Sequence, residues 1–283
     1  MSTEPLHVEI DPAAGFCFGV AAAVRKAEEA LEETGSLYCV GQLLHNVHEV
    51  KRLKDIGLRT IGREDLAGMA GRSVLFRAHG EPPESYEMSR LGGAELVDAT
   101  CPVVRKLQQR VKQSYEDGET IIIYGKPGHP EVEGVLGQID GKAFVAQRKE
   151  DVLPEQLPEY ITLFSQTTMS KEGLHSMAGW LENQGKKVKL HDTVCRQVSD
   201  RANKMEQYAR DKDVIIFVGG KNSSNANQLF DISRRINTRS HFVESPDEVQ
   251  PGWFRSGDRV GITGGTSTPV WLLEETAGKV VGG

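Results

Sequence analysis

Three of the four cysteines in this chain occupy equivalent positions in a threefold internal repeat. Cys17, Cys101 and Cys195 each precede a stretch with the periodicity of an amphipathic helix. A short apolar strand pattern follows in every copy and ends at a glycine 24 residues after the cysteine: Gly41, Gly125 and Gly219. Thiolates are ligands for soft metals and can act as nucleophiles, so the repeat predicts that three of them share one metal or catalytic site.

Three thiolates from equivalent positions suit an iron–sulfur cluster in which one iron lacks a protein ligand. An open coordination position is typical of catalytic metal sites, so the count of three favours chemistry at the cluster over simple electron transfer. Cys39 lies inside a strand pattern and outside the repeat, so we expect it to be an ordinary buried residue. A zinc site is the alternative, but the Cys-x-x-Cys pairs typical of zinc sites are absent from the sequence.

The loops after the strand patterns carry side chains that can donate hydrogen bonds to an anion. Gly264–Ser267 also precedes a helical pattern from Val270, and backbone amides at a helix start bind phosphate. The Ser-Ser-Asn loop, Ser223-Ser224-Asn225, has a second interpretation as a plain helix cap. The candidate anion-binding residues are His45, His79, His129, Ser223, Ser224, Asn225, Thr266 and Ser267.

Glu131 follows His129 by two residues and is a candidate proton donor. A carboxyl group close to a cluster and an anion tends to stay protonated, because desolvation and charge repulsion both disfavour the carboxylate. Thr167 would complete a short proton path. The alternative for Glu131 is a favourable interaction with the dipole of the helix that it begins.

Alternating strand and helix patterns predict an α/β protein with parallel sheets, which place ligands beyond the carboxyl ends of their strands. We expect three similar α/β units in a pseudo-threefold trefoil around a central iron–sulfur cluster. The predicted units are residues 15–100, 101–192 and 193–283, with the N-terminal strand of segment 1–14 closing the third unit.

The composition excludes several classes of function. A formal net charge of -6 argues against general binding to nucleic acid or to an anionic membrane, since both require a basic surface. The sequence has neither an apolar run of spanning length nor a signal-peptide pattern at its start, and its few cysteines suggest reduced thiols. It also lacks a Walker-A lysine motif. We therefore expect a cytoplasmic protein. The net charge is compatible with a small anionic ligand, because local donors bind such a ligand.

The motifs together resemble those of the 4-hydroxy-3-methylbut-2-enyl diphosphate reductase family over Leu6–Leu272. The motifs that carry the resemblance are Gly15-Phe16-Cys17-Phe18-Gly19-Val20, His45-Asn46, Arg77-Ala78-His79-Gly80, Asp98-Ala99-Thr100-Cys101-Pro102, His129-Pro130-Glu131, Gln166-Thr167-Thr168, Lys221-Asn222-Ser223-Ser224-Asn225 and Ser267-Thr268-Pro269.

The resemblance implies a [4Fe-4S] cluster on Cys17, Cys101 and Cys195, whose open iron would take the substrate hydroxyl. It implies that the diphosphate is bound by His45, His79, His129, Thr167, Ser223, Ser224, Asn225 and Ser267. Glu131, assisted by Thr167, would supply protons. Two electrons from a ferredoxin- or flavodoxin-like donor would yield isopentenyl or dimethylallyl diphosphate, the terminal step of the methylerythritol phosphate pathway. An exposed iron is prone to oxidative loss, which would leave a [3Fe-4S] cluster or none.

Two segments depart from the family pattern. Cys195-Arg196-Gln197-Val198-Ser199-Asp200-Arg201-Ala202 replaces the usual Thr-x-x-Arg-Gln after the third cysteine, and Gly264-Gly265-Thr266-Ser267 replaces Ala-Gly-Ala-Ser. A cluster-based sensor and a non-redox hydro-lyase are the alternative functions, since both also use an open iron. Stoichiometric electron consumption distinguishes the reductase from both.

Overall fold

The computed structural model describes residues 4–282 and contains, within that range, three four-stranded parallel sheets with the strand orders β3-β2-β4-β5, β7-β6-β8-β9 and β1-β12-β10-β11. The predicted α/β class is confirmed. Contacts divide the chain into two compact bodies. The first body contains the chain up to Ala21, Leu44–Asp55 and the chain from Arg196 onward; the second contains Ala22–Leu43 and Ile56–Cys195. The domain boundaries at residues 15, 101 and 193 stay predictions.

The second body holds two of the sheets. The strands of its first sheet are β2 (Leu37–Val40), β3 (Leu58–Ile61), β4 (Ser73–Phe76) and β5 (Glu95–Asp98). The strands of its second sheet are β6 (Ile121–Tyr124), β7 (Phe144–Ala146), β8 (Tyr160–Ser165) and β9 (Lys187–Leu190). The helices that connect them are α3 (Pro83–Leu91), α4 (Pro102–Glu116), α5 (Pro130–Leu136) and α6 (Lys171–Asn183).

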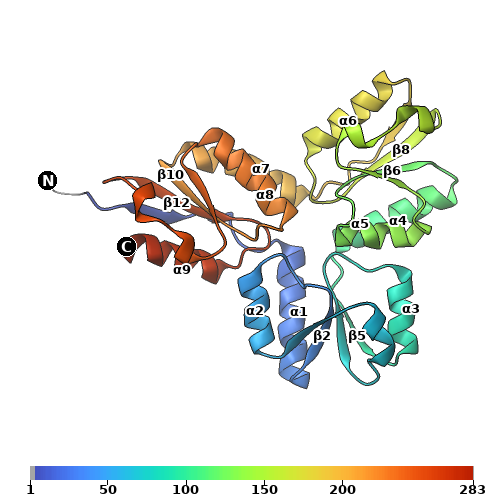
Figure 1. Cartoon of the computed structure of the whole chain (residues 1–283), viewed down its shortest axis with the longest axis horizontal. Coiled ribbons are helices and arrows are strands. Elements are labelled where there is room, and N and C mark those ends of the chain that lie inside the picture. The colour runs from blue at the N-terminus through green and yellow to red at the C-terminus, as the bar shows by residue number, and fades with distance from the viewer. Residues whose placement is uncertain (1–3, 283) are drawn as a thin grey trace. The chain divides into compact units, whose positions relative to one another are not determined.

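The first body holds the remaining sheet. Its strands are β1 (His7–Ile10), β10 (Val214–Val218), β11 (Ser240–Val243) and β12 (Arg259–Gly264). Its helices are α2 (Val47–Asp55), α7 (Arg196–Arg210), α8 (Ser224–Ile236) and α9 (Val270–Gly282). Helix α1 (Phe18–Thr34) begins in this body. Figure 1 shows the N-terminal strand β1 beside β12, and the two pair in parallel, so the start of the chain completes the last sheet.

Strand β10 shows why these sheets form. All five of its residues are apolar and buried, as expected for a parallel strand covered on both faces. Val214, Ile216 and Val218 pack toward Leu272 and Leu273 of α9. Ile215 and Phe217, which point to the opposite face, pack with residues of α7 and α8. Helices therefore cover both faces of the sheet, and the polar loops are left at its ends.

The repeat glycines have one structural role in all three copies. Each follows the last residue of a strand, and its backbone N–H donates to the last residue of the neighbouring strand: Gly41 to Ile61, Gly125 to Ala146 and Gly219 to Val243, at 2.9, 2.9 and 3.0 Å. A Cβ atom at Gly219 would lie 3.0 Å from the Cβ of Ala226, which explains why a side chain is disfavoured there. The spacing found in the sequence thus marks the ends of equivalent strands.

Candidate functional site

Each repeat cysteine is the residue immediately before a helix. Helices α1, α4 and α7 begin at the residue after Cys17, Cys101 and Cys195. The backbone N–H of each cysteine donates to a loop carbonyl beyond an equivalent strand: Cys17 to Thr266 after β12, Cys101 to Ala78 after β4 and Cys195 to Thr167 after β8, at 3.1, 3.0 and 2.8 Å. The three copies of the repeat therefore share not only their residue spacing but also this backbone hydrogen bond of the cysteine.

The surroundings of these thiols suit metal ligation. All three are half-buried. The positive end of a helix dipole stabilises a thiolate, which is the form that binds metals. Cys39, in contrast, is fully buried in β2, and burial raises the pKa of its thiol to about 12. The ordinary role predicted for Cys39 agrees with this environment, and sulfur donors at three helix starts fit an iron–sulfur group.

In the first body, the predicted anion-binding residues meet around Ser267. The Ser267 hydroxyl lies 3.3 Å from the carbonyl oxygen of His45 and 3.5 Å from the Ser223 hydroxyl. A Cβ atom at Gly220 would lie 2.3 Å from the same His45 carbonyl, so glycine permits this close approach. His45, Ser223 and Ser267 thus come from three separate segments to one place.

The Ser-Ser-Asn loop is both a helix cap and a set of donors. Ser223 is the N-cap of α8, and its hydroxyl accepts from the N–H of Ala226 at 3.2 Å. Ser224 is the first residue of the helix. The side chain of Asn225 is buried; its Oδ1 accepts from Thr266 N–H at 2.9 Å, while its Nδ2 has no hydrogen-bond partner among residues 4–282. A buried amide donor without an acceptor is costly, and a phosphate oxygen would satisfy it.

In the second body, the Glu131 carboxylate is bound at both oxygens by Thr167. Oε1 accepts from the Thr167 backbone N–H at 2.6 Å, and Oε2 accepts from the Thr167 hydroxyl at 2.7 Å. Glu131 is only 2% exposed, and burial raises its pKa to about 7 even though both hydrogen bonds from Thr167 act to lower it. The carboxyl group can therefore hold a proton near neutral pH and release it. Glu131 and Thr167, which were predicted to lie on one proton path, are thus hydrogen-bonded to each other, and their part in proton transfer stays a prediction.

His129 and His79 lie next to one another in the same body. Their ring centroids are 5.4 Å apart, with the rings nearly perpendicular. Nδ1 of His129, which caps α5, accepts from the Glu131 backbone N–H at 3.2 Å. This hydrogen bond places the proton of a neutral imidazole on Nε2, where it can be donated to an anion.

Several residues that support the site carry no obvious motif. Glu81, fully buried, pairs with Arg77 at 3.4 Å and Arg63 at 2.8 Å and so fixes the loop that carries His79. Gln197 accepts from the N–H of Phe18 at 3.1 Å, and Arg201 donates to the carbonyl of Gly15. The sequence does contain a signal for Arg201. Arg201 lies on the buried face of α7 together with Val198, Met205 and Ala209, at a position where an apolar residue is expected.

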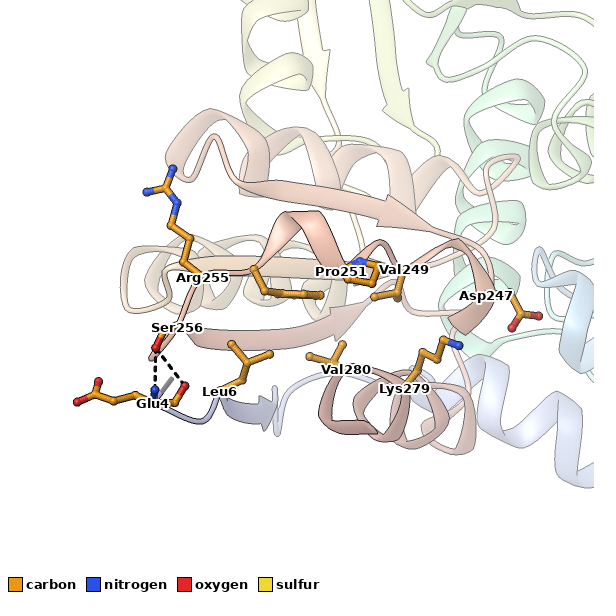
Figure 2. Close-up of a pocket in the computed structure, with 10 residues that line it drawn as sticks. Glu4, Leu6, Asp247, Val249, Pro251, Arg255, Ser256, Lys279 and Val280 are labelled. Atoms are coloured by element: carbon orange, nitrogen blue, oxygen red, sulfur yellow. Dashed lines mark hydrogen bonds between the residues drawn. The ribbon is translucent and has the colours of Figure 1, made fainter. Parts of the chain in front are cut away.

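A separate cavity of about 400 Å³ lies in the first body near the start of β1 and the end of α9. Its lining includes Leu6, Val280 and Lys279, and Figure 2 shows Ser256 hydrogen-bonded to Glu4 at its edge. None of the predicted site residues lines this cavity. This cavity is therefore separate from the predicted site.

No helix within residues 4–282 is both long and apolar enough to span a membrane. This agrees with the sequence, in which no apolar run reaches the necessary length.

The fold and these residues together define an α/β protein with cysteines at three equivalent helix starts, polar loops after its strands and a buried carboxyl group. The LytB protein family matches residues 8–281, and the chain belongs to that family. The resemblance found in the sequence motifs is thereby confirmed.

Named relatives and solved structures agree with this assignment. The chain is 42% identical to the 4-hydroxy-3-methylbut-2-enyl diphosphate reductase of Bacteroides fragilis over 277 residues, with 95% of this chain and 96% of the relative covered. It is 38% identical to the enzyme of that name from Chlorobaculum tepidum, with 94% and 93% covered. A solved structure of (E)-4-hydroxy-3-methyl-but-2-enyl diphosphate reductase, the terminal enzyme of the non-mevalonate pathway, superposes with a TM-score of 0.74 at 37% identity and covers 97% of this chain and 98% of that one.

A second solved structure, the E-1-hydroxy-2-methyl-but-2-enyl-4-diphosphate reductase from Plasmodium falciparum, has a TM-score of 0.85 at 23% identity, with 98% of this chain and 88% of that chain covered. At this identity the likeness concerns the fold alone.

Proposed function

We propose that the protein reduces 4-hydroxy-3-methylbut-2-enyl diphosphate to isopentenyl diphosphate and dimethylallyl diphosphate. The overall reaction takes two electrons and two protons; the C–O bond to the allylic hydroxyl breaks, water leaves, and a C–H bond forms. The observation that best supports it within the chain is the buried Glu131 carboxyl group, held by Thr167 with its pKa raised to about 7. The names of the relatives support the substrate and the reductive step.

Cys17, Cys101 and Cys195 would hold a [4Fe-4S] cluster with one iron free of protein ligands. When bound, the cluster would pass on, one at a time, the two electrons of an external ferredoxin- or flavodoxin-like donor and would supply a Lewis-acidic iron. Support comes from the matching positions of the three cysteines, each before a helix and each tied by its N–H to an equivalent loop. We further propose that these loops meet in the trefoil arrangement expected from the repeat.

Glu131 would supply protons. In its neutral form the carboxyl group can donate a proton to the leaving hydroxyl or to the allylic carbon. Thr167 holds the carboxyl through its backbone N–H and its hydroxyl, and its carbonyl accepts from the N–H of Cys195. The proton donor and one proposed cluster ligand are thus held by the same residue, Thr167.

The diphosphate would be bound by the polar loops of both bodies. In the first body, Asn225 offers a buried Nδ2 without a partner in residues 4–282, and Ser223 and Ser267 offer hydroxyl groups. In the second body, His129 keeps its proton on Nε2. The further proposed contacts are His45, His79, Thr167 and Ser224. Such donors stabilise the negative charge of the diphosphate.

An anaerobic assay with a reduced dye and the hydroxylated diphosphate tests this function. We expect two electrons to be consumed for each substrate converted, with both isoprenoid diphosphates as products. Conversion without electron consumption would make the protein a hydro-lyase, and binding without conversion would make it a sensor. The ferredoxin- or flavodoxin-like electron donor and the cytoplasmic location stay predictions.

A further inference from the structure

A buried arginine in the first body has donor groups that the described protein does not satisfy. Arg201 is 8% exposed, and its Nη1 donates to the carbonyl oxygen of Gly15 at 3.0 Å. Its Nε and Nη2 are buried and have no hydrogen-bond acceptor within residues 4–282. Leaving charged donors unpaired in the interior costs free energy, so these groups indicate a missing acceptor.

The position of Arg201 shows where that acceptor belongs. Gly15 is two residues before Cys17, and Gln197, one turn earlier on α7, accepts from the N–H of Phe18 at 3.1 Å. Helix α7 thus holds the cysteine loop on both sides of Cys17. The third contact is the hydrogen bond from Cys17 N–H to the carbonyl of Thr266.

The charges around Arg201 lead to the same place. Burial lowers the pKa of its guanidinium, while Asp11 and Cys17 are the neighbours whose negative charge acts in the opposite direction. Both carboxylate oxygens of Asp11 already accept hydrogen bonds, from Ala13 N–H and from the Thr263 hydroxyl, each at 2.8 Å. Cys17 is the other neighbour whose charge acts on Arg201, and the hydrogen bond from Arg201 to Gly15 holds the guanidinium at the loop that carries this cysteine.

We propose that Arg201 is a positioning residue that orders the Cys17 loop and places a positive charge against the metal-bound sulfur, which makes the cluster easier to reduce. This rests on the proposed function, because it takes Cys17 as a cluster ligand. Reduction adds negative charge to the cluster, and hydrogen bonds and charge around the sulfurs set the reduction potential. A nearby cation therefore stabilises the reduced form more than the oxidised form.

The test is a redox titration of the anaerobically purified holoprotein, followed by electron paramagnetic resonance. In Arg201→Gln we expect the ratio of reduced to oxidised cluster at a fixed potential to fall about tenfold, equivalent to about 59 mV for one electron. Arg201→Lys keeps the charge and should stay within about threefold of the parent. Arg210→Gln removes the same charge from the exposed end of α7, about 14 Å further along the helix, and should match the parent.

An Arg201→Gln protein with a full cluster and the parental ratio would overturn the proposal. If that variant instead loses the cluster or fails to fold, Arg201→Lys decides. If the Arg201→Lys protein folds and holds the cluster, the positive charge is what the site requires. If Arg201→Lys also lacks the cluster, the proposal is overturned and Arg201 has a purely structural role. A parent protein that never contains an iron–sulfur cluster would contradict the proposed function itself, which is a distinct result.

Discussion

Thr167 binds both carboxylate oxygens of Glu131, one through its backbone N–H at 2.6 Å and the other through its hydroxyl at 2.7 Å. The same threonine accepts from the N–H of Cys195 through its carbonyl at 2.8 Å. The orientation of the buried carboxyl group is therefore set by a residue that also fixes a proposed cluster ligand.

Glu131→Gln should keep the cluster and bind substrate but lose about 100-fold or more in turnover, since an amide cannot supply the proton that general acid catalysis requires. Single-turnover assays with a reduced cluster measure the loss. Glu133→Gln, in the first turn of the same helix, is the matched control and should turn over normally. Near-parental turnover in Glu131→Gln would remove the role assigned to Glu131.

Turnover should fall as the pH rises through about 7. The folded-state pKa of Glu131 is raised from the ordinary 4.5 to about 7 because the group is buried, so the proton donor is present below that pH and absent above it. The profile of kcat against pH at saturating substrate tests this, and Glu131→Gln supplies the baseline without the carboxyl group. A flat profile from pH 6 to 8.5 would contradict the assignment.

Thr167→Val should move the descending limb of that profile to higher pH. The Thr167 hydroxyl stabilises the carboxylate form of Glu131 and so lowers its pKa, whereas burial raises it. Removing the hydroxyl removes the lowering effect, so the pKa of Glu131 rises further. Thr167→Ser retains the hydroxyl and the backbone N–H and should keep the parental profile. A shift of the descending limb toward lower pH in Thr167→Val would contradict the pKa-lowering effect of the Thr167 hydroxyl on Glu131.

Ser223→Ala should weaken substrate binding and also destabilise the fold. The substitution removes the N-cap of α8, which costs about 1 kcal/mol, and removes a hydroxyl proposed to contact the diphosphate, which should raise KM about tenfold or more. Ser170→Ala removes the equivalent N-cap of α6 and is the control. We expect the two variants to show similar losses in thermal stability but only Ser223→Ala to raise KM; equal KM values would leave Ser223 as a cap alone.

Cys101→Ser should abolish cluster binding, while Cys39→Ala should retain it. Cys39 is fully buried in β2 and its thiol has a pKa of about 12, so removing its sulfur should cost about 1 kcal/mol of packing without loss of iron. Iron and sulfide content per chain, measured under anaerobic conditions, compares the two. An intact cluster in Cys101→Ser would remove that residue from the ligand set.

Much of the local fold could be predicted because the repeat fixes strand ends and helix starts together. Strand β2 and the starts of α4 and α9 fall where the sequence patterns place them. The pairing of Glu131 with Thr167 was accessible because both lie in motifs at strand ends. The two interpretations of Ser223 were not exclusive, since it caps α8 and still lies against Ser267.

The residues that sequence analysis missed act through burial and long-range contact. Arg201 and Gln197 lie in the segment that departs from the family pattern, yet both hold the loop of Cys17, about 180 residues earlier. Glu81 follows the histidine motif, but only its burial beside Arg77 and Arg63 shows that it fixes the loop. A single sequence records residue types and spacing, whereas these roles depend on which distant segments pack together.

The central claim is that Cys17, Cys101 and Cys195 hold one iron–sulfur cluster with an iron open to substrate. Mössbauer spectroscopy of anaerobically purified, iron-57-labelled protein, with and without the hydroxylated diphosphate, tests it most directly. We predict about four iron atoms per chain, with one distinct iron whose signal changes when substrate binds. Four equivalent thiolate-bound irons that ignore the substrate, or iron held equally well after all three cysteines are replaced, would contradict the claim.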